Sequence, residues 1–270
     1  MNTTTTILND LMPLEEGQRH TFRNEGHAVV RNILNGEELD FYRKAITTAA
    51  AKFNKEQRKM EERDTYGKAF LQIMNLWEVD ETVKRFVFAK RFAGLAAQLM
   101  GVSSVRLYHD QALFKEPGGG PTPWHQDQYY WPLDTSNCIT MWMPLVDINV
   151  EMGMLTFATG SHKHGLVENL DISDESEARL NAYVRDHNLL IRQPEFLSAG
   201  DATFHYGLTL HNAPGNKTSK MREVMTIIYF AEGARVIHPN SVHQEADRQR
   251  WLRGIEPGQL AASELNPVLF

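Results

Sequence analysis

His125 and Asp127 stand two positions apart in the segment Trp-His-Gln-Asp, and a third candidate ligand, His211, follows far downstream. Residues at this spacing point to the same face of a strand, so the two side chains are expected to lie together. A histidine from a distant strand would complete a set of two imidazoles and one carboxylate. That donor set leaves coordination positions open on a metal and is typical of non-heme Fe(II) oxygenases.

The His-x-Asp pattern alone is a weak indication, because the chain has 11 histidines and chance pairs are frequent. Its ordinary role would be a hydrogen bond in a loop. A Gly/Pro-rich segment, 116–121, comes shortly before the motif, and aromatic residues surround it: Trp124, Tyr129, Tyr130 and Trp131. Aromatic walls would exclude water from an oxidising pocket, although each ring alone would more ordinarily belong to a barrel core.

His211 is expected at the end of an apolar strand, 201–210, and directly before a turn over 212–216. A histidine at a strand end is well placed to face the mouth of a barrel. His205 lies on the same stretch and competes for the role of metal ligand. A buried histidine without a ligand role is the ordinary alternative for both.

Arg222 opens the apolar segment 223–230. A planar guanidinium binds a carboxylate through two parallel hydrogen bonds, so an inward-facing Arg222 would suit the distal carboxylate of 2-oxoglutarate. Lys217 and Lys220 precede it in the sequence. A surface arginine within a basic cluster is therefore an equally good interpretation of the spacing.

The composition suits one globular domain of 270 residues, with 42% hydrophobic and 23% charged residues. A net charge of -6 gives no electrostatic support for a nucleic-acid partner. The single cysteine, Cys138, excludes an intrachain disulfide and fits a reducing compartment. The first six residues lack the features of a signal peptide, and no apolar run approaches the roughly 20 residues that span a bilayer. We therefore expect a cytoplasmic protein without a membrane partner.

The pattern along the chain predicts one domain, 1–270, in three parts. Residues 1–103 are expected to be mainly helical support, 104–232 a β core, and 233–270 a polar tail. A charged, partly helical insertion is expected at 167–195. Gly/Pro-rich turns separate the predicted strands, which favours a sandwich or barrel. The predicted strands are 27–34, 105–114, 138–145, 154–158, 201–210 and 224–230.

Between about residue 72 and residue 230 the chain resembles the phytanoyl-CoA dioxygenase family of Fe(II)/2-oxoglutarate oxygenases. Three blocks carry the resemblance: 108–118 with 123–127, the stretch 153–162 that ends in Gly-Ser-His, and 200–222. Arg222 follows His211 by eleven residues, the interval that the family uses between its distal histidine and its arginine. The resemblance implies a double-stranded β-helix, or jelly-roll, core with helices around it.

The resemblance assigns roles to individual positions. His125, Asp127 and His211 match the iron ligands, and Arg222 matches the arginine that binds the distal carboxylate of 2-oxoglutarate. Trp142 matches a tryptophan that lines the 2-oxoglutarate site. Gln111 occupies a cofactor-contacting position, and Gln72 lies where some members have a lysine directed toward the cofactor.

One departure from the family is Ala213, since many members have a serine two residues after the distal histidine. The missing hydroxyl could be replaced by Thr209, Thr140 or water. Asp127 is informative in the opposite sense, because halogenating relatives replace this carboxylate with a small residue. Its presence favours hydroxylation.

The implied cofactors are Fe(II), 2-oxoglutarate and O2, and the implied reaction is hydroxylation of an unactivated C–H bond with release of succinate and CO2. The partner is expected to be a small, partly apolar molecule. Desaturation, epimerisation and cyclisation use the same iron chemistry and remain alternatives. A non-catalytic cupin-like binding protein is the alternative from another class.

Overall fold

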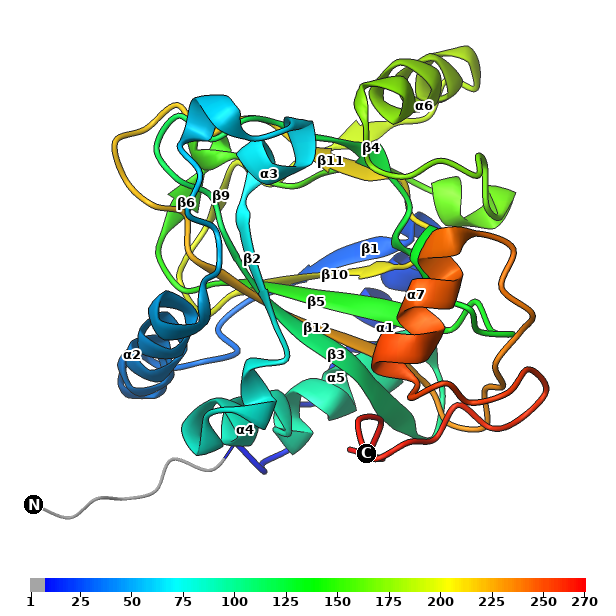
Figure 1. Ribbon diagram of the computed structural model, residues 1–270. Helices are drawn as coiled ribbons and strands as arrows, with labels where there is room; N and C mark the ends of the chain where they lie inside the picture. The colour runs from blue at the N-terminus through cyan, green and yellow to red at the C-terminus, as the bar shows by residue number, and fades with distance from the viewer. Residues whose placement is uncertain (1–7) are drawn as a thin grey trace, which may run out of the picture.

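The computed structural model describes residues 8–270, so the expectation about the first six residues lies outside the described part. The core is a six-stranded antiparallel sheet in the order β1-β10-β5-β12-β3-β2, which faces a smaller four-stranded sheet in the order β4-β11-β7-β8 (Figure 1). A two-stranded ribbon, β6-β9, completes the strands. The predicted jelly-roll class with flanking helices is confirmed.

The strands of the large sheet are β1 (His27–Val30), β2 (Leu71–Met74), β3 (Val105–Phe114), β5 (Cys138–Pro144), β10 (Ala202–Tyr206) and β12 (Val224–Ala231). Those of the small sheet are β4 (Thr122–His125), β7 (Thr156–Ala158), β8 (Ile191–Arg192) and β11 (His211–Ala213). The ribbon is formed by β6 (Ile148–Asn149) and β9 (Phe196–Leu197).

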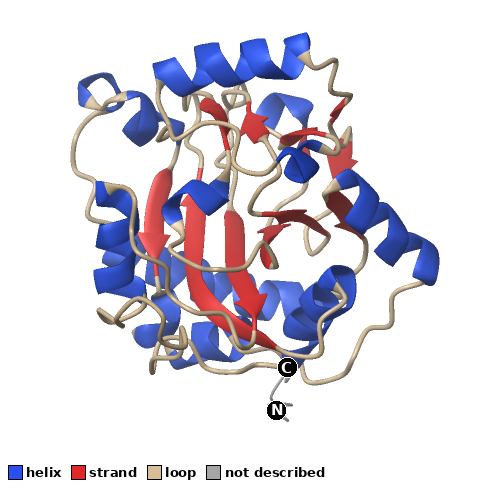
Figure 2. Cartoon of the chain, turned by 90° about the vertical axis from the view of Figure 1, so that its right-hand side faces the viewer, coloured by secondary structure: helices blue, strands red, loops and turns tan. Residues whose placement is uncertain are grey.

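Helices surround the strands, as Figure 2 shows. The α-helices are α1 (Glu16–Glu25), α2 (Gly36–Phe53), α3 (Thr65–Ala69), α4 (Glu81–Val87), α5 (Lys90–Met100), α6 (Asp174–Asp186) and α7 (Val242–Trp251). Short 3-10 turns are η1 (Met60–Glu62), η2 (Leu76–Glu78), η3 (Asp127–Tyr130), η4 (Val150–Met152) and η5 (Ser161–His164). Within residues 8–270, no helix is long and apolar enough to span a membrane.

The helix α5 packs against the large sheet on the side away from the small one (Figure 1). Phe92, Leu95 and Leu99 fall on one face of this helix and are fully buried. The helix ends at Gly101, which adopts a positive φ of 74° and donates its N–H to the Ala97 carbonyl at 2.8 Å. This apolar layer supports the large sheet, which forms one wall of the cavity.

Two expectations about local structure are wrong in detail. His211 does not end the strand that begins near residue 201. The strand β10 stops at Tyr206, a turn follows, and His211 begins β11 in the other sheet. Asp127 is not on a strand either, because β4 ends at His125 and η3 begins at Asp127. Gln126 between them is still extended (φ -123°, ψ 124°), so the two side chains nevertheless lie on one side.

The insertion and the C-terminal segment both carry helices next to the small sheet. The helix α6 lies within 167–195 and packs on β4, where the Glu177 carboxylate accepts a hydrogen bond from the Trp124 N–H at 2.8 Å. The segment 233–270, expected as a polar tail, contains α7, which contacts η3. Both segments therefore border the motif that contains His125 and Asp127.

Candidate active site

Three side chains from the small sheet and its edge form a candidate metal centre. The ligand atoms of His125, Asp127 and His211 all lie within 4.8 Å of one another. Asp127 Oδ1 is 3.5 Å from Nε2 of His125 and 3.7 Å from Nε2 of His211. The structure thus brings together the three residues whose types and spacing suggested a metal site.

Backbone carbonyls fix the two imidazole rings. His125 Nδ1 lies 2.7 Å from the Pro123 carbonyl, and His211 Nδ1 lies 2.9 Å from the Thr209 carbonyl. A carbonyl only accepts, so both Nδ1 atoms carry the proton and both Nε2 atoms keep a lone pair. Such a second hydrogen bond is the usual way in which proteins orient a histidine ligand.

The other oxygen of Asp127 has its own partners. Thr140 donates its hydroxyl to Oδ2 at 2.9 Å, and His205 Nε2 lies 3.3 Å from the same oxygen. His205 therefore contacts the carboxylate from the side that does not face His125 and His211. The competition between His205 and His211 is resolved geometrically, since His211 belongs to the three-residue cluster and His205 does not.

The protonation states suit a divalent cation. Burial, with the charge of His125 nearby, holds the pKa of His211 well below its ordinary value, so this ring is neutral. Burial opposes ionisation of Asp127, but the surrounding imidazoles, His211 first and then His125 and His205, outweigh it and hold the pKa of Asp127 well below its ordinary value. A neutral imidazole and an ionised carboxylate are the forms that bind metals.

Arg222 is a buried cation without an acidic partner among the described residues, with only 2% of its side chain exposed. Its Nη1 donates to the Gly153 carbonyl at 2.5 Å, its guanidinium carbon lies 5.3 Å from the Trp142 ring centre, and its buried Nε has no partner. Burial lowers the pKa of Arg222 to about 9, so it stays charged at neutral pH. An unpaired buried cation of this kind is suited to binding an anion.

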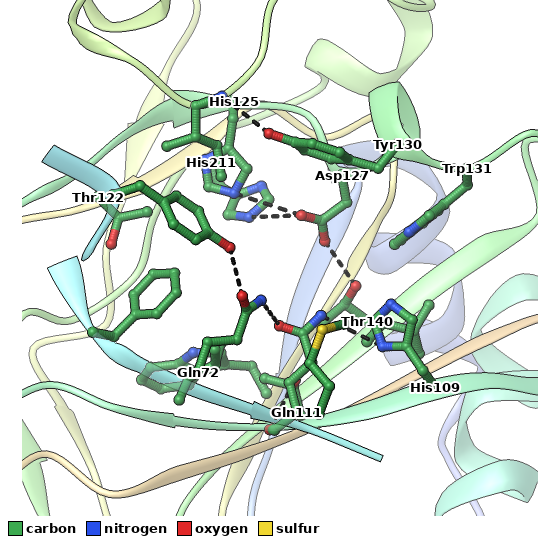
Figure 3. A pocket seen from close by; sticks show the side chains of 18 of the residues that line it. Gln72, His109, Gln111, Thr122, His125, Asp127, Tyr130, Trp131, Thr140 and His211 are labelled. Carbon is green, nitrogen blue, oxygen red and sulfur yellow. Dashed lines mark hydrogen bonds and ion pairs between the residues drawn. The ribbon is translucent and has the colours of Figure 1, made fainter. Parts of the chain in front are cut away.

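One cavity of about 470 Å³ connects the metal cluster with Arg222. Figure 3 shows Gln72 and Gln111 below the cluster, with Thr122 to one side and Trp131 to the other. The residues that resemblance places near the cofactor all line this cavity: Gln72, Gln111, Trp142, Ala213 and Arg222.

The hydroxyls of Thr209 and Thr140, which were candidates to replace the serine hydroxyl missing at Ala213, are both engaged in other hydrogen bonds. Thr209 donates its hydroxyl to the Gly26 carbonyl at 2.8 Å and is fully buried. Thr140 lines the cavity, but it donates to Asp127. Thr122 also lines the cavity, near Ala213 on the paired strand, and offers a hydroxyl there.

The opposite end of the cavity contains residues that the sequence interpretation missed. The helix α7 places His243, Asp247 and Arg250 on the lining, and Trp251 follows. The first three are spaced at i, i+4 and i+7, which puts them on one helix face. This spacing predicts that the three side chains share a face of the helix, but it does not predict that the helix packs on η3, which follows the His125–Asp127 motif.

The aromatic cluster next to the motif divides between cavity and core. Tyr130 and Trp131 line the cavity, as do Asp171 and Ile172 from the insertion. The Tyr130 hydroxyl accepts a hydrogen bond from the Ile172 N–H at 3.0 Å, which joins the motif to the insertion. Trp124 is buried against the insertion, and its ring packs in the cluster that contains Leu180 and Val184.

A jelly-roll core that holds two histidines, one carboxylate and an unpaired arginine in one cavity defines the 2-oxoglutarate-dependent non-heme iron oxygenases. Residues 22–224 match the family model for phytanoyl-CoA dioxygenase. The chain belongs to the phytanoyl-CoA dioxygenase family.

A phytanoyl-CoA dioxygenase of Arabidopsis thaliana is 30% identical over 158 residues, which are 56% of this chain and 53% of that protein. The chain thus matches about half of this relative's length. The non-heme alpha-ketoglutarate-dependent carbocyclase SnoK from nogalamycin biosynthesis has the same fold, with a TM-score of 0.77, 24% identity and coverage of 94% and 96% of the two chains. The epimerase SnoN, solved in complex with Fe3+, alpha-ketoglutarate and nogalamycin RO, matches with a TM-score of 0.75 and 25% identity. The match covers 94% of this chain and 98% of SnoN.

Proposed function

We propose that this protein uses Fe(II) and 2-oxoglutarate to hydroxylate a C–H bond of a small, partly apolar molecule. One observation carries the proposal: the His125–Asp127–His211 cluster shares a cavity with the unpaired buried cation Arg222. A metal-binding protein without this chemistry would have no use for an uncompensated guanidinium beside its metal site.

In this proposal His125, Asp127 and His211 bind the iron. Their donor set fits Fe(II), because the two Nε2 atoms and Oδ1 converge on the lining of an open cavity that would leave room for further ligands. Thr140 and His205 hold the carboxylate so that Oδ1 points toward the metal.

Arg222 binds the distal carboxylate of 2-oxoglutarate through the guanidinium edge that has no protein partner. Trp142 lies against the guanidinium and limits where it can turn. Gln72 and Gln111 line the same space and offer amide groups to the co-substrate. The orphaned Nε of Arg222 is the feature that fits such an anion.

When bound, iron and 2-oxoglutarate supply the activation of O2, with succinate and CO2 as co-products. The chain orients the reactants and excludes water. Tyr130 and Trp131 give the cavity an aromatic wall, and Ile228 adds an apolar surface from β12. These groups would hold the reacting carbon near the open metal positions.

Succinate formation from 2-oxoglutarate, measured with Fe(II) across a panel of small molecules, tests the proposal. A true substrate raises succinate release above the rate without substrate, and its product gains one oxygen atom. Desaturation would instead remove two hydrogens, and epimerisation, which the likeness to SnoN makes the second candidate, would leave the mass unchanged. Iron binding without 2-oxoglutarate binding would overturn the proposal in favour of a binding protein.

A further inference from the structure

A chain of hydrogen bonds runs along the floor of the cavity (Figure 3). The Tyr66 hydroxyl donates to Gln72 Oε1 at 3.0 Å, and Gln72 Nε2 donates to Gln111 Oε1 at 2.8 Å. Gln111 Nε2 then lies 3.5 Å from His109 Nδ1. The chain links α3, β2 and β3 and ends on an imidazole that takes no part in the metal cluster.

The polarity of this chain follows from the tyrosine at its start. If both glutamine amides were turned around, Gln72 would present an N–H to Tyr66, and the tyrosine's own proton would lose its acceptor on Gln72. Loss of that hydrogen bond is unfavourable, so the orientation in which Tyr66 donates is favoured. Gln111 therefore directs an N–H toward His109, which makes Nδ1 an acceptor and places the ring proton on Nε2.

His109 is in position to use that proton. Its side chain is 2% exposed, its ring lies 5.1 Å from the Trp251 ring, and it lines the cavity. Burial lowers the pKa of His109 to about 3, so the ring is neutral. Within residues 8–270, Gln111 is its hydrogen-bonding partner and Nε2 has none. Figure 3 shows His109 on the Trp131 side of the cavity, away from Thr122.

We propose that His109 Nε2–H is a fixed hydrogen-bond donor to an uncharged oxygen of the substrate, a carbonyl, ether or hydroxyl group. This inference rests on the proposed function and names the substrate class for the same cavity. Tyr66, Gln72 and Gln111 are positioning residues that act through His109.

The surroundings of His109 favour a neutral substrate group over an anionic one. Asp171 and Asp247 line the cavity beside α7, together with His243 and a single arginine from that helix, Arg250. Apolar surfaces of Trp131, Ile228 and Trp251 complete it. A molecule with an apolar ring system and a polar oxygen matches this arrangement, since the His109 donor sits among these apolar walls.

The tautomer of His109 is the first test and needs no substrate. Nitrogen NMR of protein with isotope-labelled histidine distinguishes the two neutral tautomers, and His109→Gln assigns the signal by its loss. We expect the Nε2–H form in the native protein. Gln111→Glu replaces the donor with an acceptor and should move the proton to Nδ1, whereas the same change at exposed Gln57 should have no effect. A native Nδ1–H form, or no response to Gln111→Glu, overturns the proposal.

The second test uses two probes of similar shape, cyclohexanone and methylenecyclohexane. Cyclohexanone should shift the His109 Nε2–H signal and methylenecyclohexane should not. Cyclohexanone affinity should fall about tenfold in His109→Phe, which keeps a ring but loses the donor. His109→Gln, whose amide can reach the same point, should recover most of it. Equal responses to the two probes contradict the proposal, as does unchanged affinity in His109→Phe.

The proposed function can fail independently of this inference. If the proposed function is right, binding of 2-oxoglutarate to the Fe(II)-loaded protein should produce a charge-transfer absorption band, to which His109 does not contribute. If the band is absent while the tautomer and probe results hold, the oxygenase proposal fails and the oxygen-binding pocket stands. If the band is present and the tautomer result fails, only the role of His109 is lost.

Discussion

His211 lies directly opposite His125 in the antiparallel pairing of β11 with β4, with ring centroids 4.0 Å apart. The two rings come from positions separated by most of the core sequence, so their approach depends on strand register. The register shifts between His211 and Ala213, which confines the regular pairing to the neighbourhood of the histidines. A slip by one residue would turn His211 to the other face and remove the metal site.

Removing one proposed ligand should abolish iron binding and succinate formation together. Asp127→Ala leaves two imidazoles without the anionic ligand, so Fe(II) affinity should fall at least about a hundredfold. Iron titration and succinate release measure the two effects. His164→Ala, which removes an exposed histidine bonded to Tyr183, is the control and should bind iron normally. Turnover at the native rate in Asp127→Ala would refute the site.

The hydroxyl of Thr140 should matter for iron binding, whereas that of Thr203 should not. Thr140 donates its hydroxyl to Asp127 at 2.9 Å. Thr140→Val removes this hydrogen bond and lets the carboxylate rotate, so the affinity for Fe(II) should fall about tenfold or more. Thr203 lies on the neighbouring strand β10, and its buried hydroxyl has no hydrogen-bond partner among the described residues. Thr203→Val should therefore leave the affinity for Fe(II) unchanged and should leave the melting temperature unchanged or higher. Equal effects of the two changes on iron affinity would count against the role of Thr140.

Arg222 should control the affinity for 2-oxoglutarate. Arg222→Lys keeps a positive charge but loses the planar fork, so the dissociation constant of 2-oxoglutarate should rise about tenfold or more, with iron binding retained. Titration of the charge-transfer band of the Fe(II)-loaded protein gives the constant. Lys220→Ala removes an exposed cation nearby and should change nothing. The role of Arg222 is wrong if both variants bind the co-substrate as tightly as the native protein.

Asp247 should make stability depend on pH. Burial raises its pKa from 3.8 to about 7, although a hydrogen bond from Tyr108 and the charge of Arg250 oppose the shift. The folded protein then holds a proton that the unfolded chain releases, so the free energy of unfolding falls as pH rises from about 4 to about 7 and levels off above.

Asp247→Asn removes this contribution, because an amide oxygen still accepts from Tyr108 but carries no charge. The variant should be more stable than the native protein at pH 8 by roughly 1 to 3 kcal/mol, and the two should converge near pH 4. Urea unfolding at several pH values measures the difference. Burial also raises the pKa of Asp110 to about 7, so this residue preserves part of the pH dependence of stability in the variant. Asp186 is exposed, so Asp186→Asn should leave the pH dependence of stability unchanged. If the free energy of unfolding depends on pH equally in Asp247→Asn and in the native protein, Asp247 does not have the raised pKa.

Local patterns predicted the strands well where apolar or β-branched residues run without interruption. The strand β3 has the expected bounds, 105–114, and β12 extends the expected one by a single residue. The expected strand 201–210 was too long, because Gly207 and Leu208 form a turn that transfers the chain to the other sheet. An apolar sequence does not reveal such a transfer, which depends on packing between the sheets.

The candidate site was predicted only in part. The family interval between His211 and Arg222 predicted two residues that the structure places in one cavity, since they lie close together in the sequence. His109, Gln72 and Tyr66 form their hydrogen-bond chain across separate elements, and periodicity within one element does not predict it. The contribution of α7 likewise depends on contacts with η3 that are distant in the sequence.

The family match ends at residue 224, and α7 begins at Val242. The proposed metal ligands, with Arg222, and the helix that forms one wall of the cavity therefore lie in different stretches of the chain. Exchange of the terminal stretch among relatives would change this wall while leaving the proposed metal ligands and Arg222 intact. The segment between residue 224 and Val242 is therefore a natural place to join the core of one relative to the terminal stretch of another.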